Sequence, residues 1–425
     1  MTNPCAENSV ALQLPNGRLA LHSIFFIIFN CLYFVPLVSV MLFNYSEGGT
    51  STAADLDPDV MTKMTIVYIL GIVAFVLGSH LSSHFKRADP PGLNLAGLTW
   101  RFKFLCVITA ALLIASKILL VSQGVYSEYA FTTDSMIGGV WSFSMVCSES
   151  LVLLSIVVLF SNGRHNVLWF ALLTAINALN LLHGTRFFFV IGAMIFFFYL
   201  YVHRKLTYRM AIVGTGVVLF VGYVIFLLRS HVEVDNQTFS AISLLSPMMF
   251  EGIFSQLSLI GTIRHPEAWS LYGSAHHFVL DTLYFITPRF LLPAKDQLLF
   301  MDQYSDLSPM GAFSGYAQGL IYFGVFFPGF YLVVGYIAGW LQRRAKSSHF
   351  FSVMYVYFVC DFLFRLMRDG YVIPIKMLVD SMLITLCVAC LELQIHPRAT
   401  PAFEVSSIGS PNEHSGARRT GSVEC

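Results

Sequence analysis

Long apolar runs separated by short polar connections fill most of the chain. A transmembrane helix needs about 20 predominantly apolar residues to cross roughly 30 Å of hydrocarbon. Runs close to this length occur at 21–43, 64–82, 104–122, 140–160, 167–182, 187–202, 210–229, 314–340, 350–366 and 371–391. The pattern predicts an all-α, polytopic membrane protein with about ten transmembrane helices.

The basic residues of the short connections set the orientation. If each run crosses once, one side receives Lys86, Arg87, Arg101, Lys103, Arg164, Arg204, Lys205, Arg209, Arg343, Arg344 and Lys346. Lys and Arg concentrate in cytoplasmic loops. That side is therefore cytoplasmic, and both termini are predicted to lie there.

The segment between predicted helices 7 and 8 becomes a large external loop, about 230–313. Its apolar stretches, 241–263 and 275–292, either both cross or neither does, because a single extra crossing would place the basic segment 342–346 outside. We expect interfacial or re-entrant helices there. Residues 1–394 are predicted to form one transmembrane domain, and the polar segment 395–425 a disordered cytoplasmic tail.

Composition supports this interpretation and excludes several classes. Hydrophobic residues make up 56% of the 425 residues and charged residues only 12%, too little polar surface for a soluble globule. The net charge of +1 gives no reason to expect a nucleic-acid partner. The chain contains no GxSxG, HExxH or P-loop pattern, so hydrolase, zinc-protease and NTPase functions lack support.

Several cations fall on the external side, where the orientation rule disfavours them. They are Arg186, Arg229, Arg264, Arg289, Lys295, Arg365 and Arg368. The planar guanidinium grips phosphate oxygens with two parallel hydrogen bonds, so such a set near the headgroup plane suits a diphosphate-linked lipid. Single members are equally explained as interfacial residues that bind lipid phosphates. Arg365 and Arg368 have Asp361 and Asp369 nearby, and a local ion-pair network remains an alternative for them.

Other ionisable residues are candidates for proton transfer. His277 and Asp281 share a face if 275–287 is helical, and the carboxylate would then orient the imidazole as a general base. Glu251, alone among apolar neighbours, is a rival base. Within predicted spans lie Lys117, Glu149, Lys376 and Asp380, and the last two are spaced to neutralise each other.

Three aspartates in the first external connection form a candidate metal site. Asp55, Asp57 and Asp59 offer hard ligands at close spacing for Mg²⁺ or Mn²⁺. Helix capping and solvation explain them equally well, because a helix starts soon after. We predict that neither a metal nor another cofactor is required, since the external cations supply the positive charge.

Three short motifs resemble the O-antigen polymerase (Wzy-type) family of oligosaccharide repeat-unit polymerases. They are His183-Gly-Thr-Arg186, the segment Thr287-Pro-Arg289-Phe-Leu-Leu-Pro293-Ala-Lys295, and Gly311 to Gly324. Gly311, Gly315 and Gly319 repeat every four residues and permit close backbone approach. The layout, with a large external loop late in the chain, is similar too.

The resemblance implies a membrane glycosyltransferase of the bacterial inner membrane. It would transfer a growing glycan from polyprenyl diphosphate to a new lipid-linked repeat unit on the periplasmic face. Its partners would be the polyprenyl-diphosphate-linked oligosaccharide, membrane lipids and a chain-length regulator. Arg186, Arg289 and Lys295 match the motifs best, whereas none of the candidate bases His277, Asp281 and Glu251 lies inside one.

Three other functions remain open. An O-antigen ligase would use the same donor with a different acceptor. A polyprenyl-phosphate-sugar glycosyltransferase would use a metal at Asp55–Asp59. A flippase or transporter of lipid-linked oligosaccharide would line a central path with its charges, and the outward bias of the cations disfavours it.

Overall fold

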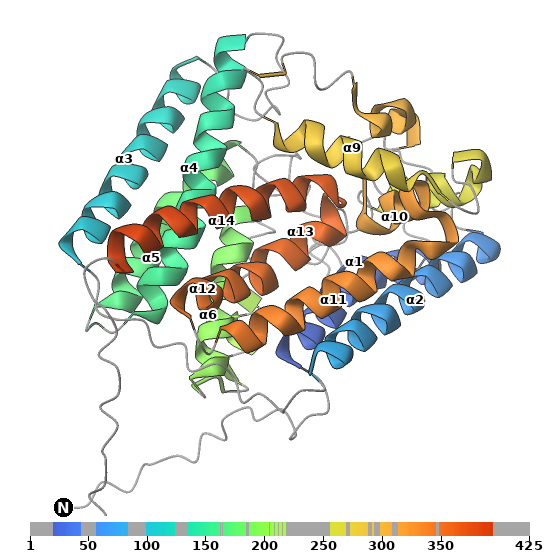
Figure 1. Ribbon diagram of the computed structural model, residues 1–425, viewed down its shortest axis with the longest axis horizontal. Coiled ribbons are helices and arrows are strands. Elements are labelled where there is room, and N and C mark those ends of the chain that lie inside the picture. Colours follow the sequence, from blue (N-terminus) through green and yellow to red (C-terminus); the bar gives the residue numbers. More distant parts are fainter. Residues whose placement is uncertain are drawn as a thin grey trace, which may run out of the picture.

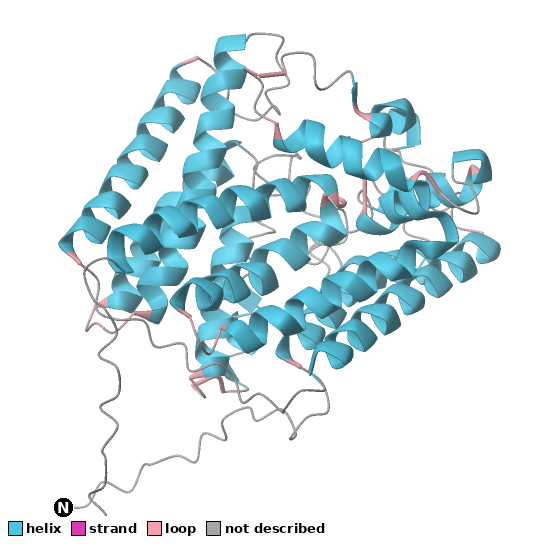
Figure 2. Ribbon diagram, viewed as in Figure 1, coloured by secondary structure: helices cyan, strands magenta, loops and turns pink. Residues whose placement is uncertain are grey.

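The computed structural model is helical throughout its described elements (Figures 1 and 2). The described residues are 20–43, 57–83, 99–123, 135–161, 163, 165–183, 187–203, 205–207, 209–210, 212–214, 216–217, 256–268, 273–287, 291–292, 298–307, 313–345 and 348–393. The polar tail 395–425 and most of the expected helix 210–229 lie outside this set.

The described elements of the first half of the chain are helices of 6 to 26 residues. They are α1 (Leu21–Phe43), α2 (Pro58–Ser83), α3 (Trp100–Ser122), α4 (Ser135–Phe160), α5 (Asn166–Asn177), the 3₁₀ helix η1 (Ala178–His183) and α6 (Phe187–Val202). Each coincides with an apolar run of the sequence, which confirms the pattern-based helix assignments in this half.

The helices of the second half are interrupted more often by short 3₁₀ and π segments. Its elements are η2 (Pro266–Ala268), α9 (Ala275–Ile286), η4 (Phe300–Leu307), α10 (Gly315–Phe323), η5 (Gly324–Phe326), α11 (Phe327–Arg344), α12 (His349–Tyr357), the π-helix η6 (Phe358–Phe362), α13 (Leu363–Arg368) and α14 (Val372–Leu393). The run from α12 through η6 to α13 is continuous and almost entirely buried.

Within the described parts of the chain, five helical stretches are long and apolar enough to cross a membrane. They are Pro58–Ser82, Trp100–Ser122, Ile137–Phe160, Gly315–Arg344 and His349–Arg368. Shorter apolar helices cover Leu21–Val35, Asn166–Leu181 and Phe187–Val202. The architecture fits a polytopic membrane protein, while the total of ten crossings stays a prediction.

The expected single helix over 314–340 is wrong in one respect, because the chain reverses at Gly324. A Cβ atom added to Gly315 would lie 3.0 Å from the Tyr331 hydroxyl, although sixteen residues of straight helix would separate them by about 24 Å. Gly324 has φ 54°, a left-handed value that glycine adopts without a steric penalty. Consequently α10 folds back along α11, and α11 alone remains as the candidate for the predicted crossing.

Glycines bring several backbones into direct contact. Gly78 of α2 faces the Leu332 carbonyl of α11, and Gly335 of α11 faces the Phe75 carbonyl of α2. In the Gly311–Gly324 motif, Gly315 faces the Leu366 carbonyl and Gly319 faces the Tyr371 hydroxyl. The predicted close approach is therefore confirmed at positions 315 and 319, as expected for small-residue packing in membranes.

The described part of the segment predicted to be external, 230–313, contains short helices. Helix α9 has 12 residues and is about 18 Å long, too short to cross the hydrocarbon core. Val279, Leu280 and Leu283 of α9 are exposed, whereas Leu259 and Thr262 in the helical turn region 256–264 are fully buried. These features are compatible with an interfacial α9 and a re-entrant 256–264.

Candidate functional site

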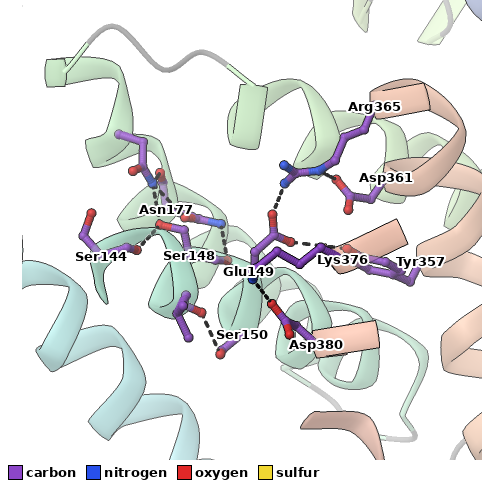
Figure 3. Close-up of polar contacts among 12 residues, drawn as sticks. Ser144, Ser148, Glu149, Ser150, Asn177, Tyr357, Asp361, Arg365, Lys376 and Asp380 are labelled. Carbon is purple, nitrogen blue, oxygen red and sulfur yellow. Dashed lines mark hydrogen bonds and ion pairs between the residues drawn. The ribbon is translucent and has the colours of Figure 1, made fainter. Parts of the chain in front are cut away.

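A cluster of buried charges lies where α4, η6 and α13 meet (Figure 3). Arg365 donates from Nε to Asp361 Oδ1 at 2.9 Å, and its terminal nitrogen donates to Glu149 Oε1. The side chains of Arg365, Glu149 and Asp361 are only 7%, 5% and 0% exposed. One guanidinium therefore joins two carboxylates that lie far apart in the sequence.

Aromatic rings enclose the guanidinium. Arg365 Cζ lies 3.7 Å from the ring centre of Phe187 and 5.7 Å from that of Phe188, both at the start of α6. Arg368 Cζ lies 5.5 Å from the same Phe187 ring. The negative face of the ring stabilises both cations in place of water.

The π-helix η6 accounts for the position of Asp361. It adds a wide turn in the middle of the buried run 349–368, and Asp361 is its one charged residue. Wide turns of this kind occur mostly as single bulges in α-helices, frequently at functional sites. A fully buried aspartate on such a turn is costly, so its presence calls for a strong partner, which Arg365 provides.

Helix ends meet at this level of the molecule. Phe187 begins α6, Arg368 ends α13, and Gly370, with φ 77°, makes the turn into α14. Helix α4 extends from Glu149 for a further 14 residues, about 21 Å, to its first residue, Ser135. The cluster therefore lies near the middle of α4 and not at its end.

The charges of the cluster do not balance in their ionised forms. Two carboxylates face one guanidinium, and Asp361 Oδ2 has no hydrogen-bond partner among the described residues. Tyr357 donates to Glu149 Oε2 at a long 3.5 Å. Either a proton or a further cation must compensate the second carboxylate, because an unpaired charge is costly away from water.

Additional polar residues border the cluster. Lys376 and Asp380 form an ion pair on α14, which packs against both α4 and η6, and this confirms the neutralisation predicted from their spacing. On the other side, Asn180 Nδ2 donates to Ser148 Oγ at 2.8 Å, and Asn177 Nδ2 donates to the Ser148 carbonyl at 3.1 Å. Polar contacts therefore extend across α4 from α14 to η1.

Five of the predicted site residues lie outside the described residues, so their roles stay predictions. They are Arg186, Arg229, Glu251, Arg289 and Lys295. Arg186 nevertheless directly precedes Phe187, whose ring contacts Arg365 and Arg368. The His183–Arg186 motif therefore leads into the charged cluster.

Arg365 differs from the expectation of a cation near the headgroup plane. It is 6% exposed and already bound by two carboxylates, so the ion-pair alternative describes it correctly. Arg368 is more open, with a side chain 22% exposed and Asp369 at 3.8 Å. Arg264 is exposed beside the buried turn region 256–264. Of the three described cations, Arg368 and Arg264 are the ones with surface to contact a ligand.

The proposed hydrogen bond between Asp281 and His277 is not formed among the described residues. Asp281 instead accepts from the backbone N–H of Phe300 at 2.8 Å and from the Tyr322 hydroxyl at 2.5 Å, with Met301 N–H at 3.3 Å. His277 stacks on Phe300, with ring centres 3.9 Å apart. Asp281 therefore ties α9 to η4 and α10, because these donors occupy both of its carboxylate oxygens.

Asp57 and Asp59, the described aspartates of the candidate metal site, lie at the start of α2. Asp57 Oδ1 accepts from the Val60 N–H at 2.8 Å, the geometry of a helix cap, and Asp59 pairs with Lys63. This confirms the capping alternative for Asp57. Asp55 lies outside the described residues.

Glu149 is the site residue that the sequence did not connect with Arg365. It was visible only as a charge inside a predicted span, and 216 residues separate it from Arg365. The local signal was stronger for Asp361, which precedes Arg365 by one helical turn.

The helices and this internal ion cluster define a polytopic membrane protein with a charged site inside its helical bundle. Residues 21–255, more than half of the chain, match the family O-antigen polysaccharide polymerase Wzy. The chain belongs to this family. The match includes Glu149 and the His183–Arg186 motif, whereas the motifs at 287–295 and 311–324 lie beyond it. No curated protein and no solved structure matched the chain.

Proposed function

We propose that this protein polymerises lipid-linked oligosaccharide repeat units on the periplasmic face of the bacterial inner membrane. An acceptor sugar hydroxyl on one repeat unit bonds to the anomeric carbon of the growing glycan. The bond from that carbon to the diphosphate oxygen breaks, and the polyprenyl diphosphate leaves with the electron pair. A base takes the hydroxyl proton.

The observation that carries this proposal is the position of the buried cluster. Arg365 and Arg368 lie over Phe187, the residue that follows the His183–Arg186 motif within the matched region. The reaction develops negative charge on a diphosphate, and fixed guanidinium groups in a water-poor site stabilise such charge strongly. Arg365 positions this region, and Arg368 and Arg186 are the residues proposed to contact the leaving group.

The remaining predicted residues are proposed either as further cations or as candidate bases. Arg289, Lys295, Arg229 and Arg264 supply further positive charge to the external side. Glu251 and His277 are the candidate bases, since the oxygens of Asp281 are already engaged by Phe300, Met301 and Tyr322.

A deletion strain separates polymerase from ligase. A polymerase deletion should retain surface polysaccharide with a single repeat unit attached and lose long chains. Accumulation of unattached polymer would instead identify a ligase. Loss of both long chains and single attached repeat units, with lipid-linked repeat units retained on the cytoplasmic side, would identify a flippase.

Arginine variants in that strain test the diphosphate contacts. Arg186→Ala and Arg289→Ala should each abolish long chains at normal protein levels, and Lys at either position should rescue poorly because it lacks the two-pronged donor geometry. Arg101→Ala, at the exposed start of α3, is the matched control. Full-length polymer from Arg289→Ala would remove that residue from the site.

Metal chelation distinguishes the second enzyme candidate. Purified protein should polymerise lipid-linked repeats in excess EDTA, and the double variant Asp55→Ala with Asp57→Ala should keep activity if it folds. Loss of activity that Mg²⁺ or Mn²⁺ restores would support the metal-dependent polyprenyl-phosphate-sugar glycosyltransferase.

The proposed orientation places both termini and the 341–349 connection in the cytoplasm. A reporter fused after Gln342 should therefore be active only as a cytoplasmic reporter. Periplasmic activity at this position would overturn the orientation, and with it the assignment of the Arg365 region to the periplasmic side.

A further inference from the structure

The ion pair of Lys376 and Asp380 places accessible charges on a predicted membrane span. Its side chains are 24% and 35% exposed, whereas those of the inner cluster are at most 7% exposed. The two residues lie four and eight positions after Val372, the first residue of α14, about 6 and 12 Å along the helix axis. Ionisable residues within a span pair with each other or face the bundle interior or water, because hydrocarbon solvates charge poorly. The exposed part of this pair therefore requires contact with water.

The pair lies on the outward side of α14. Lys376, Asp380, Leu383 and Cys387 are spaced four, three and four residues apart, so they share one side of the helix. Leu383 is 58% exposed, and Cys387 is exposed as well. Thr385, on the opposite side, is buried. One accessible side of α14 therefore presents two charges and, further along, apolar side chains.

The change from charged to apolar side chains gives the level at which water meets hydrocarbon on this side. Only three residues, about 4.5 Å along the axis, separate Asp380 from Leu383. An exposed leucine is stable against acyl chains, whereas an exposed ion pair is not. Water therefore reaches along α14 as far as Asp380, and Leu383 faces lipid.

Helix α14 also forms part of the wall around the proposed reaction site. It packs against α4 and η6, which carry Glu149 and Asp361 of the inner cluster, and against α9. Arg368, proposed to contact the diphosphate, ends α13 four residues before α14 begins. Figure 3 shows the pair in the same close-up as the inner cluster. The water-facing pair therefore lies on an element that the substrate approaches.

The pair offers both kinds of hydrogen-bonding group. Lys376 donates one N–H to Asp380, which leaves two donors on the ammonium group and further lone pairs on the carboxylate. A sugar hydroxyl both donates and accepts, so it can bond to either member of the pair. A phosphate is an acceptor with negative charge, and the Asp380 carboxylate repels it. The chemistry of the pair therefore favours a saccharide over an anion.

We propose that Lys376 and Asp380 bind saccharide hydroxyls of the lipid-linked substrate at a water-facing surface of α14. The ammonium group donates to one hydroxyl oxygen, and the carboxylate accepts from a hydroxyl. Because the two charges cancel, the pair orients the sugar without competing with Arg368 for the diphosphate. The choice of a saccharide as the ligand rests on the proposed function, whereas the water-facing surface does not.

Thiol labelling of the full-length protein in phosphatidylcholine nanodiscs tests the surface. A charged methanethiosulfonate reagent, which does not enter hydrocarbon, should modify Lys376→Cys and Asp380→Cys, as measured by mass spectrometry of the labelled peptide. Leu383→Cys is the matched control on the same side of the helix and should stay unmodified, as should the native Cys387. Lack of modification at position 376 or 380, or equal modification of Leu383→Cys, would overturn the surface.

Ile373→Cys keeps the ion pair intact and tests saccharide binding. Position 373 is half-buried and lies one turn before Lys376 on the same side of α14. Lipid-linked repeat units purified from the deletion strain should slow its modification about tenfold when about nine sites in ten are occupied. Undecaprenyl phosphate at the same mole fraction should not slow it. Replacing the pair in this background, with Lys376→Met and Asp380→Leu, should remove the protection.

Three results would overturn the saccharide assignment. They are unchanged modification of Ile373→Cys with lipid-linked repeat units, equal protection by undecaprenyl phosphate, and protection that persists without the pair. The proposed function fails separately, because the deletion phenotype is scored on surface polysaccharide without labelling. Long chains retained in the deletion strain would remove the polymerase assignment and leave the labelling of positions 376 and 380 as a test of the surface.

Discussion

Two ion pairs with the same four-residue spacing lie in opposite environments of this protein. Asp361 and Arg365 have side chains 0% and 7% exposed, whereas Asp59 and Lys63 have side chains 71% and 54% exposed. The inner pair recruits Glu149 from another helix and rests on Phe187. The side chains of the outer pair are mostly exposed, and the same spacing therefore has different consequences.

Four-residue spacing predicts that an ion pair forms, but the burial of the pair determines how much it contributes to the free energy of unfolding. An exposed pair gains little, because water solvates each charge nearly as well as the partner does. A buried pair gains more Coulomb energy but becomes costly to break, since the remaining charge is stranded. Lys376 and Asp380, 24% and 35% exposed, lie between these extremes.

The largest effect should follow from removing the inner cation. Arg365→Ala strands Glu149 and Asp361 without their guanidinium, which should cost about 3–5 kcal/mol. We expect little folded protein, measured as the melting temperature and the monodisperse fraction after solubilisation. A companion variant, Arg365→Met with Glu149→Gln and Asp361→Asn, removes all three charges and should recover most of the loss. Normal stability of Arg365→Ala alone would contradict the stranded-charge argument.

An intermediate effect is expected on α14. Lys376→Met leaves Asp380 partly buried but within reach of solvent, so the loss should be about 1–2 kcal/mol. The melting temperature of the purified protein measures it, with Asp380→Asn in the same background as the control. If Lys376→Met were as destabilising as Arg365→Ala, the loss of stability would not increase with the burial of the ion pair, contrary to our expectation.

The smallest effect is expected at the start of α2. Lys63→Ala should cost about 0.5 kcal/mol or less, the usual value of an exposed helical pair. The loss of stability caused by Lys63→Ala should become smaller still in high salt, because exposed charges are screened. A clear drop in melting temperature that persists in high salt would show that Lys63 has a role beyond this pair.

Much of the fold was predictable because hydrophobic runs and helix length follow from the membrane itself. Local spacing likewise predicted the Asp361–Arg365 and Lys376–Asp380 pairs. The reversal at Gly324 was not predicted, since α10 and α11 form one apolar run in the sequence and are separated only by the short helix η5, which begins at the left-handed Gly324. An apolar run predicts that its residues are buried, but it does not predict where the chain reverses direction.

The site was less predictable than the fold. Glu149 reaches Arg365 through the packing of α4 against the later helices, and no pattern in the sequence encodes that contact. The shared face of His277 and Asp281 was correct as helical geometry, yet Tyr322 and the backbone of η4 occupy the carboxylate. Competing partners from other elements are invisible to local spacing.

We propose that the inner cluster serves the transfer reaction and is not only a brace between helices. The direct test is polymer formation by the charge-free variant Arg365→Met with Glu149→Gln and Asp361→Asn, at protein levels and melting temperature matched to the parent. We expect a folded protein that leaves single repeat units unextended. Long polymer at the parental level from this folded variant would contradict it and reduce the cluster to a structural role.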